Sequence, residues 1–253
     1  MAVLTEKQIK YGFDYYHKDD ARPKSVVEVS EYDGEDKLII NCTQLEESYS
    51  AKSKKRIWME WCDFLVNNPD TFTELMFCTR MPQELFDAVC AQRRLKRLHI
   101  KWGVYPDISK LENLQELEYL HIGSGRSVSS LEPISRLVNL VALSIENFQQ
   151  IDDYAPLANL KHLESLALEG DFAAPKILKV QSIEFLRHMK QSRFFSFLTA
   201  KVIDKDYSPI LELNNLEHLT LKSCKEVKQL YPQFVKLPKL KYGTVLERPE
   251  LYE

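Results

Sequence analysis

Two histidines are the residues best placed for chemistry in this 253-residue chain. His99 and His121 each precede the last apolar residue of a Leu-x-x-Leu-x-Ile phrase. If the two phrases form neighbouring strands, both imidazoles stand in one column, close enough to share a metal ion. No third ligand is in register, because Ser144 takes the next position and Cys78 falls in a different column. We therefore expect neutral, exposed histidines and no metal or other cofactor.

Other catalytic constellations are missing from the sequence. Gly123-Ser124-Gly125 follows a strand phrase, but it lacks the third glycine and the long helix of a nucleotide site. No Ser/His/Asp or Cys/His set can meet within one repeat, and no carboxylate pair stands in an apolar setting. We expect the chain not to be an enzyme.

The phrase that carries the histidines recurs along the chain and determines the architecture. Its successive central leucines, Leu98, Leu120, Leu143 and Leu166, are 22, 23 and 23 residues apart. A unit of this length has one apolar face that it can bury only against its neighbours, so the chain must stack into a solenoid. The five clear copies are Leu95-x-x-Leu98-x-Ile100, Leu117-x-x-Leu120-x-Ile122, Leu140-x-x-Leu143-x-Ile145, Leu163-x-x-Leu166-x-Leu168 and Leu216-x-x-Leu219-x-Leu221.

The segments between the phrases repeat as well. Pro133, Pro156 and Pro209 occupy the same place in three of them, where proline suits the first turn of a helix. An Ile/Leu-x-x-Leu pattern follows each proline and has the spacing of one buried helical stripe. Each unit is therefore predicted to be a short strand, a turn and a short helical or 3₁₀ piece.

Period, strand phrase and Pro-Leu position together resemble the bacterial leucine-rich repeats of the internalin type, over roughly residues 72–246. The resemblance implies an α/β leucine-rich repeat solenoid, with a curved parallel sheet on the concave face and short helices or 3₁₀ turns on the convex face. The chain departs from the family at the position that usually holds a turn-bonding Asn. That position reads Gly103, Gly125, Phe148, Asp171 and Cys224, so the turns must satisfy their backbone groups in another way.

Three regions are expected. Residues 1–70 form an N-terminal cap, in which the apolar runs 26–29 and 38–40 flank an Asp-Gly turn and predict a hairpin. An amphipathic helix is expected over residues 54–67, and a second helix begins at Pro82. Residues 71–246 are the repeats, about seven rungs, and residues 247–253 are a C-terminal tail. A separate role for the cap stays open.

An insertion is expected over residues 171–193, because the phrase returns late after Leu166. Its apolar residues are predicted to form the core of an enlarged convex helix, with a partner-binding bulge as the alternative. They are Phe172, Pro175, Ile183, Phe185, Leu186 and Met189. A worn rung follows within residues 194–199, where Phe194, Phe195 and Phe197 permit two registers.

The residues between the leucines are free to bind, because strand alternation turns them away from the core. Basic and aromatic side chains gather on two adjacent rungs, and two glutamates flank the small residues of the middle rungs. Arg, Tyr and Trp dominate protein interfaces, so this set is the predicted partner-binding site. Its members are Arg97, His99, Lys101, Trp102, Tyr119, His121, Glu146 and Glu169.

Composition narrows the class of partner. A net charge of −3 gives no general case for nucleic acid, and no apolar segment is long enough to span a membrane. No small-molecule substrate is evident. Five scattered cysteines and the absence of export or wall-anchoring segments predict free thiols and a cytoplasmic protein. We expect a protein-interaction module that binds a protein on its concave face. An immunity or antitoxin protein and a regulatory subunit of an enzyme stay open as alternatives.

Overall fold

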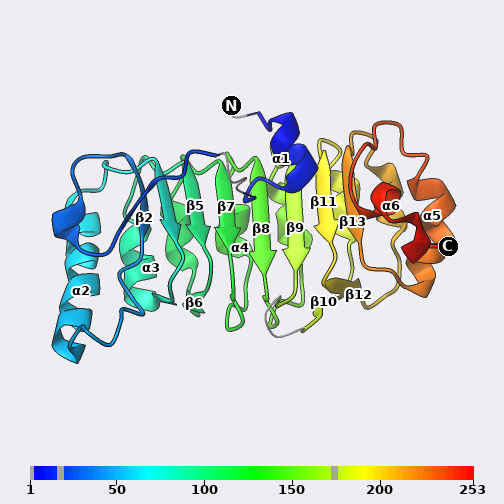
Figure 1. The fold of residues 1–253 in the computed structure, drawn as a ribbon. Helices are drawn as coiled ribbons and strands as arrows, with labels where there is room; N and C mark the ends of the chain where they lie inside the picture. Colours follow the sequence, from blue (N-terminus) through cyan, green and yellow to red (C-terminus); the bar gives the residue numbers. More distant parts are fainter. Residues whose placement is uncertain (1–2, 16–19, 172–175) are drawn as a thin grey trace.

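A long parallel sheet is the main structural element of the molecule (Figure 1). The computed structural model describes residues 3–15, 20–171 and 176–253. Among these residues, nine strands pair side by side, all parallel. In spatial order they are β1 (Lys24–Val26), β2 (Lys37–Ile40), β3 (Glu74–Phe77), β5 (Arg97–Ile100), β7 (Tyr119–Ile122), β8 (Ala142–Glu146), β9 (Ser165–Glu169), β11 (Phe194–Phe197) and β13 (His218–Leu221).

The strand register follows the repeated phrase. Leu98 pairs with Leu120, and Leu120 pairs with Leu143, so equivalent leucines stack in one buried row. In β11, Phe195 pairs with both Leu166 and Leu219. This pairing settles the open register, with Phe195 and Phe197 facing the core. We call the sheet surface that faces away from this core the concave face.

Short helical pieces cover the other face of the sheet, as predicted. They are η2 (Ser109–Asn113), α4 (Glu132–Ser135), η3 (Ala155–Asn159), η4 (Glu184–His188) and η5 (Ser208–Glu212). Pro133, Pro156 and Pro209 stand in the first turn of α4, η3 and η5. Neighbouring pieces pack against one another, which closes the core on the convex side.

The predicted N-terminal hairpin is wrong. β1 and β2 pair in parallel, and the chain between them contains the 3₁₀ turn η1 (Val29–Glu31). Parallel strands need a crossover that returns the chain to the same end of the sheet. Here the Asp33-Gly34 turn belongs to that crossover, with Gly34 at a φ of +106°. The two strands therefore continue the repeat sheet.

The two predicted helices are present. α2 (Ala51–Asn67) buries Ile57, Trp61 and Leu65, and the Trp61 indole donates a hydrogen bond to the Val27 carbonyl at 2.8 Å. α3 (Gln83–Val89) begins directly after Pro82 and buries Leu85, Phe86, Ala88 and Val89. Two short strands, β4 (Met81–Pro82) and β6 (Gly103–Val104), pair beside them. This packing covers the first rungs of the core.

The insertion does not enlarge a convex helix. η4 is as short as η2, η3 and η5, and Ile183, Phe185, Leu186 and Met189 fill the same buried places as in an ordinary rung. The extra residues lie before it, where β10 (Leu178–Val180) pairs in parallel with β12 (Ala200–Val202). Phe172 and Pro175 lie outside the described residues.

The other end of the solenoid is closed by three short helices. They are α5 (Lys225–Phe234), α6 (Thr244–Glu247) and η6 (Pro249–Leu251). Tyr252 is buried against this end, and its hydroxyl donates to the Leu221 carbonyl at 2.6 Å. The last residues are therefore packed onto the final rung.

Buried tyrosines satisfy backbone groups near the turns that lack the family's Asn. The Tyr105 hydroxyl donates to the Gly123 carbonyl, as that of Tyr252 does to Leu221. The Val202 amide donates to the Tyr207 hydroxyl at 3.2 Å. Tyr105 and Tyr252 thus supply a hydrogen-bond donor from a different part of the chain near two of these turns.

We predict that Tyr105→Phe lowers the free energy of unfolding by about 1–3 kcal/mol, because it leaves a buried carbonyl without this donor. Tyr154→Phe is the matched control. Tyr154 is equally buried, but its hydroxyl has no hydrogen-bond partner among the described residues, so its removal should be neutral or stabilising. Urea denaturation of the two variants measures the difference, and equal losses would contradict the role of Tyr105.

Candidate protein-binding face

Two columns of side chains run along the concave face. The first reads Glu74, Arg97, Tyr119, Ala142, Ser165, Phe194 and His218, and the second reads Met76, His99, His121, Ser144, Ala167, Ser196 and Thr220. Large and charged residues stand on β3, β5 and β7. Small residues stand on β8 and β9, so the middle of the face has a flat floor.

Four of the predicted site residues meet on β5 and β7. The Arg97 guanidinium lies 4.5 Å from the centre of the Tyr119 ring, a cation–π contact. The His99 and His121 rings stack with centroids 4.2 Å apart and 14° between their planes. Arg97 also lies 3.9 Å from Glu74, measured from Nε to Oε1. These four side chains therefore stand beside one another on two paired strands, and His121 is buried there, although exposed histidines were expected.

Lys101 and Trp102 lie beyond this cluster, just past the end of β5. Lys101 is exposed and Trp102 is half-buried. Trp102 lines a shallow hollow of about 320 Å³, together with Ser124, Arg126 and Asn147. These two residues lie at the ends of the strands, among the turn residues, and do not join the histidines.

The two glutamates of the predicted site stand on neighbouring strands. Glu146 and Glu169 pair in register at the ends of β8 and β9. The Glu169 carboxylate accepts hydrogen bonds from Ser196 Oγ at 2.5 Å and from the Thr199 amide and hydroxyl at 2.8 and 2.6 Å. Its oxygens are thus engaged within the chain, which connects β9 to the turn after β11.

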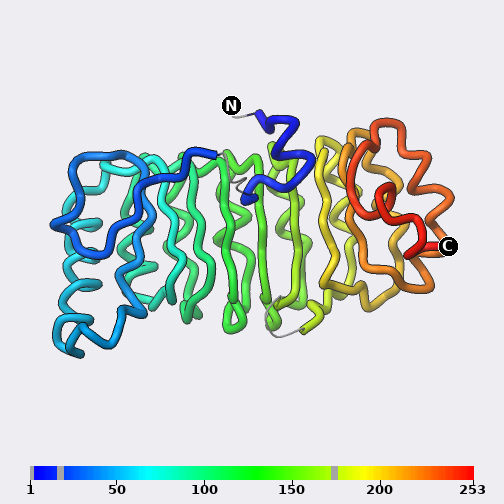
Figure 2. Tube along the Cα trace, viewed as in Figure 1, coloured from blue at the N-terminus to red at the C-terminus, as the bar shows by residue number. Residues whose placement is uncertain are grey.

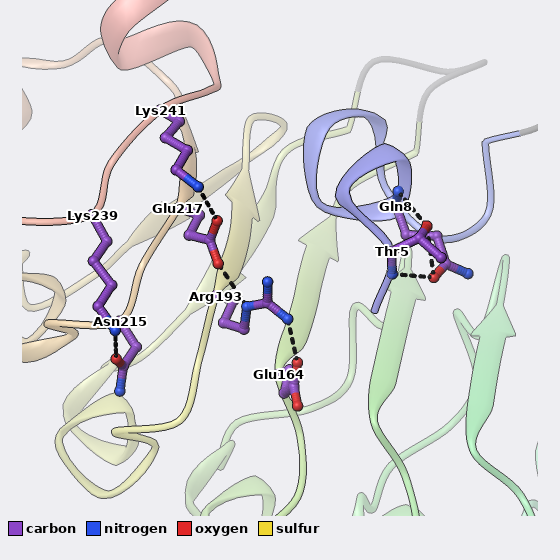
Figure 3. Close-up of polar contacts among 8 residues, drawn as sticks. All are labelled: Thr5, Gln8, Glu164, Arg193, Asn215, Glu217, Lys239 and Lys241. Atoms are coloured by element: carbon purple, nitrogen blue, oxygen red, sulfur yellow. Dashed lines mark hydrogen bonds and ion pairs between the residues drawn. The ribbon is translucent and has the colours of Figure 1, made fainter. Parts of the chain in front are cut away.

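The N-terminal segment, residues 3–15, lies on the concave face, a placement that the sequence analysis did not foresee. Figures 1 and 2 show its helix α1 (Glu6–Tyr11) in front of the strand starts near β8 and β9. A capping box begins the helix, with Thr5 and Gln8 each bonding the other's backbone (Figure 3). Leu4, Ile9 and Phe13 form one buried cluster, in which the sheet contributes Val141 and Ala142.

Polar contacts fix the end of the segment over the basic cluster. Arg97 Nη1 donates to the Phe13 carbonyl at 3.2 Å, and Asp14 Oδ2 lies 3.2 Å from His121 Nδ1. Burial alone would raise the pKa of Asp14, but its hydrogen bond to His121 and the nearby His99 lower that pKa below the usual range. The arrangement favours a carboxylate at this point.

The start of the segment reaches the last rung. Tyr242 donates from its hydroxyl to Glu6 Oε1 at 2.8 Å, and the Lys10 ammonium lies 5.6 Å from the centre of the Tyr242 ring. Burial lowers the pKa of His218 to about 4, while the backbone at Ile9 and Lys10 acts in the opposite direction. The N-terminal segment therefore contacts rungs from β5 to the C-terminal end of the sheet.

A row of ion pairs connects the strand starts beside α1, as Figure 3 shows. Arg193 Nη1 lies 3.1 Å from Glu164 Oε2, and Arg193 Nε lies 2.7 Å from Glu217 Oε1. Lys241 Nζ lies 2.9 Å from Glu217 Oε2 and completes the row. Arg193 therefore connects three rungs, a role that the sequence analysis missed because it placed this residue in an insertion.

The signal for the docked segment was present but weak. Thr5 and Gln8 form a capping-box pair, and Leu4, Ile9 and Phe13 are apolar among charges. The first thirteen residues show no continuous apolar run, so they carry no mark of a core element. A single turn and a half of helix cannot be assigned a docking place without the sheet.

The fold is similar to the folds of solved internalin structures. An internalin (inlF) from Listeria monocytogenes has a TM-score of 0.52 and 18% identity, over 81% of this chain and 51% of that one. The chain has an internalin-like leucine-rich repeat fold, of a divergent kind. Internalin C2 of the same bacterium is 19% identical over 71% of each chain, with a TM-score of 0.49.

Other comparisons show weaker similarity or none. A leucine-rich repeat protein of Leptospira interrogans is 15% identical, covering 81% of this chain and 64% of that one at a TM-score of 0.39. No protein-family model and no curated protein matches the chain. The chain spans about half the length of the first internalin.

Three further properties bear on the kind of site. Within residues 3–15, 20–171 and 176–253, no group of three or more His, Cys, Asp or Glu side chains could hold a metal ion. In the same part of the chain, no helix is long and apolar enough to cross a membrane. The five cysteines are free, with Cys42 and Cys90 buried. Burial raises the pKa of Cys42 to about 12, so its thiol is unreactive at neutral pH.

We predict that acid weakens the fold through the concave-face histidines. Burial, then His121, lowers the pKa of His99 to about 3, and burial lowers that of His218 to about 4. Because an unfolded histidine titrates near 6.5, the native state holds fewer protons than the unfolded chain below that pH. The free energy of unfolding should therefore fall by about 2 kcal/mol per histidine from pH 6.5 to pH 5.

Urea denaturation at pH 7.5 and pH 5.0 measures this fall. The His99→Gln variant should show about half of the loss, because it lacks one of the two groups. The control is His162→Gln, which replaces an exposed histidine and should keep the full loss. A flat pH profile in the unmodified protein would contradict the assignment.

Arg193 is predicted to stabilise the last rungs. The Arg193→Met variant keeps the apolar stem but leaves the Glu164 and Glu217 carboxylates without their shared cation. Arg193 is 27% and Glu217 12% exposed, so we expect a loss of about 1–3 kcal/mol in the free energy of unfolding. The control is Arg136→Met, whose partner Glu112 and own side chain are both well exposed, and which should show no measurable change.

Proposed function

We propose that the chain is a non-enzymatic protein-interaction module that binds a protein segment on the concave face of its repeat sheet. The fold supports a binding role, because a solenoid presents a long continuous surface and few enclosed pockets. The basic and aromatic residues on β5 and β7 supply the side-chain types that anchor protein interfaces.

One observation carries the proposal: this face already holds a peptide segment, the chain's own residues 3–15. The sheet buries three apolar side chains of that segment and pairs with its carboxylate through His121. A surface that accommodates a short helix with both apolar and charged contacts has the chemistry of a peptide-binding face.

The strand-end half of the face offers a second set of contacts. Lys101 and the hollow beside Trp102 lie outside the cluster that the N-terminal segment covers. A partner that reaches this half would meet the Lys101 cation and the Trp102 indole. An acidic loop or helix with an apolar anchor matches this set.

A reducing compartment such as the cytoplasm is the proposed site of action. Five cysteines are free, and none forms a disulfide in the described residues. Disulfides form readily in oxidising compartments and are rare in the cytosol, which supports this placement.

The test is capture of partners on the immobilised full chain, read by mass spectrometry. We expect the double variant Lys101→Ala, Trp102→Ala to retain at least tenfold less of the specific partner, because a buried Trp anchor is worth about 2 kcal/mol or more. The control is Val138→Ala, an exposed residue that follows α4 on the opposite side of the sheet. Equal capture by both variants would place the binding site elsewhere.

The identity of the captured protein separates the alternatives. A toxin domain would favour an immunity or antitoxin role, and a kinase or phosphatase would favour a regulatory subunit.

A further inference from the structure

The N-terminal segment is packed as a separate unit on the sheet. The main core forms one continuous cluster from Val26 to Tyr252, beneath the strands. Leu4, Ile9 and Phe13 belong to a second cluster, on the opposite side of the sheet. Removing the segment would uncover sheet residues such as Ala142 but would open no part of the main core.

The segment has a defined binding pattern. Three apolar residues, Leu4, Ile9 and Phe13, face the sheet, while Glu6 and Lys7 on the helix are exposed. Gly12, at a φ of +91°, ends the helix and turns Phe13 and Asp14 toward β7. The binding pattern thus consists of three apolar residues, the second five positions after the first and the third four positions after the second. The carboxylate of Asp14 follows directly.

The receiving surface complements this pattern. A flat apolar patch at Val141 and Ala142 lies under the helix, and a cationic end at Arg97, with His121 beside it, receives the terminal backbone and carboxylate. Tyr119 lies between the two parts, with its ring centroid 6.0 Å from that of Phe13. The apolar side chains of the segment therefore meet apolar residues of the sheet, and its terminal carboxylate meets the cationic end.

We propose that residues 3–15 are a built-in competitor: the concave face is a receptor for a partner's short amphipathic helix with this same pattern, and the partner displaces the chain's own segment. The inference rests on the proposed function of this face as a protein-binding surface. It specifies the partner's chemistry as an apolar residue just before a short helix, a second apolar residue within the helix, and then an aromatic residue and an Asp or Glu.

Because the segment is tethered to its docking site, a partner needs a minimum affinity to displace it. A segment joined to its own docking site acts at an effective concentration on the order of millimolar. A partner helix with an equal fit would therefore be excluded unless it made further contacts. Lys101 and Trp102, at the uncovered strand ends, are placed to supply them.

The experiment uses the full chain and a synthetic peptide with the sequence of residues 3–15, labelled with fluorescein. Ile9→Asp puts an unpaired carboxylate into the apolar cluster and should release the segment. Val3→Asp is the matched control, because Val3 is 69% exposed whereas Ile9 is 1% exposed. Fluorescence anisotropy should show at least tenfold tighter peptide binding to Ile9→Asp than to the wild type or to Val3→Asp.

A peptide that carries Phe13→Asp should bind all three proteins at least tenfold more weakly than the parent peptide binds Ile9→Asp. Equal binding of the parent peptide by the three proteins would overturn the proposal. So would absence of binding to an Ile9→Asp chain whose circular dichroism matches the wild type. A wild-type dimer that becomes monomeric on Ile9→Asp, seen by light scattering, would show that the segment docks on a second copy.

Hydrogen exchange of the wild type tests the same point if Ile9→Asp fails to fold. The amides of Ile9 and Gly12 should exchange at least a hundredfold faster than those of Leu143 in β8, because the segment opens without the core. Equal protection would make the segment an integral part of the fold and would overturn the proposal.

The two proposals fail in different ways. Peptide binding by Ile9→Asp without any capture that depends on Trp102 would reject Lys101 and Trp102 as partner contacts and leave the receptor face standing. Capture that depends on Trp102, without peptide binding, would reject the built-in competitor alone.

Discussion

The whole molecule depends on the strict alternation of side chains along parallel strands that pair in register. Because Leu98, Leu120 and Leu143 stack in one row, every residue between the leucines must face the other way. The same constraint that builds the core therefore assembles the columns of the concave face. A shift of one residue in any strand would exchange the two sets, so the register of the core and that of the concave face are fixed together.

The repeat could be predicted from the sequence because it is local and redundant. Leu98 and Leu120 occupy equivalent positions in two successive strands. The prolines of the convex turns repeat in the same way, so an error in assigning one repeat would be corrected by the others. The rung at Phe195 could not be fixed, since three phenylalanines fit two registers until Leu166 and Leu219 pair on either side. Asp33-Gly34 predicted a hairpin because a turn signal does not reveal whether the strand that follows pairs parallel or antiparallel.

The site was only partly predictable, for a physical reason. Arg97, His99, Tyr119 and His121 were placed correctly in neighbouring columns by register alone. What covers them was not predictable, because the contacts of Asp14 with His121 and of Glu6 with Tyr242 join residues very far apart in the sequence. Short periodicity carries no information about such pairs. The same limit applies to Arg193, because its two partners, the Glu164 and Glu217 carboxylates, lie on separate rungs.

The contact between Glu6 and Tyr242 also orders events during synthesis. Residues 3–15 are synthesised before the repeats, yet their docking surface includes Ala142 and, through Glu6, Tyr242, which lies 236 residues later in the chain. Chains are made at roughly 5–20 residues per second, and their N-terminal parts usually fold first. Here a segment that precedes the repeats must wait until Tyr242 has been synthesised. Its docked state therefore requires that the chain has been made as far as this last rung.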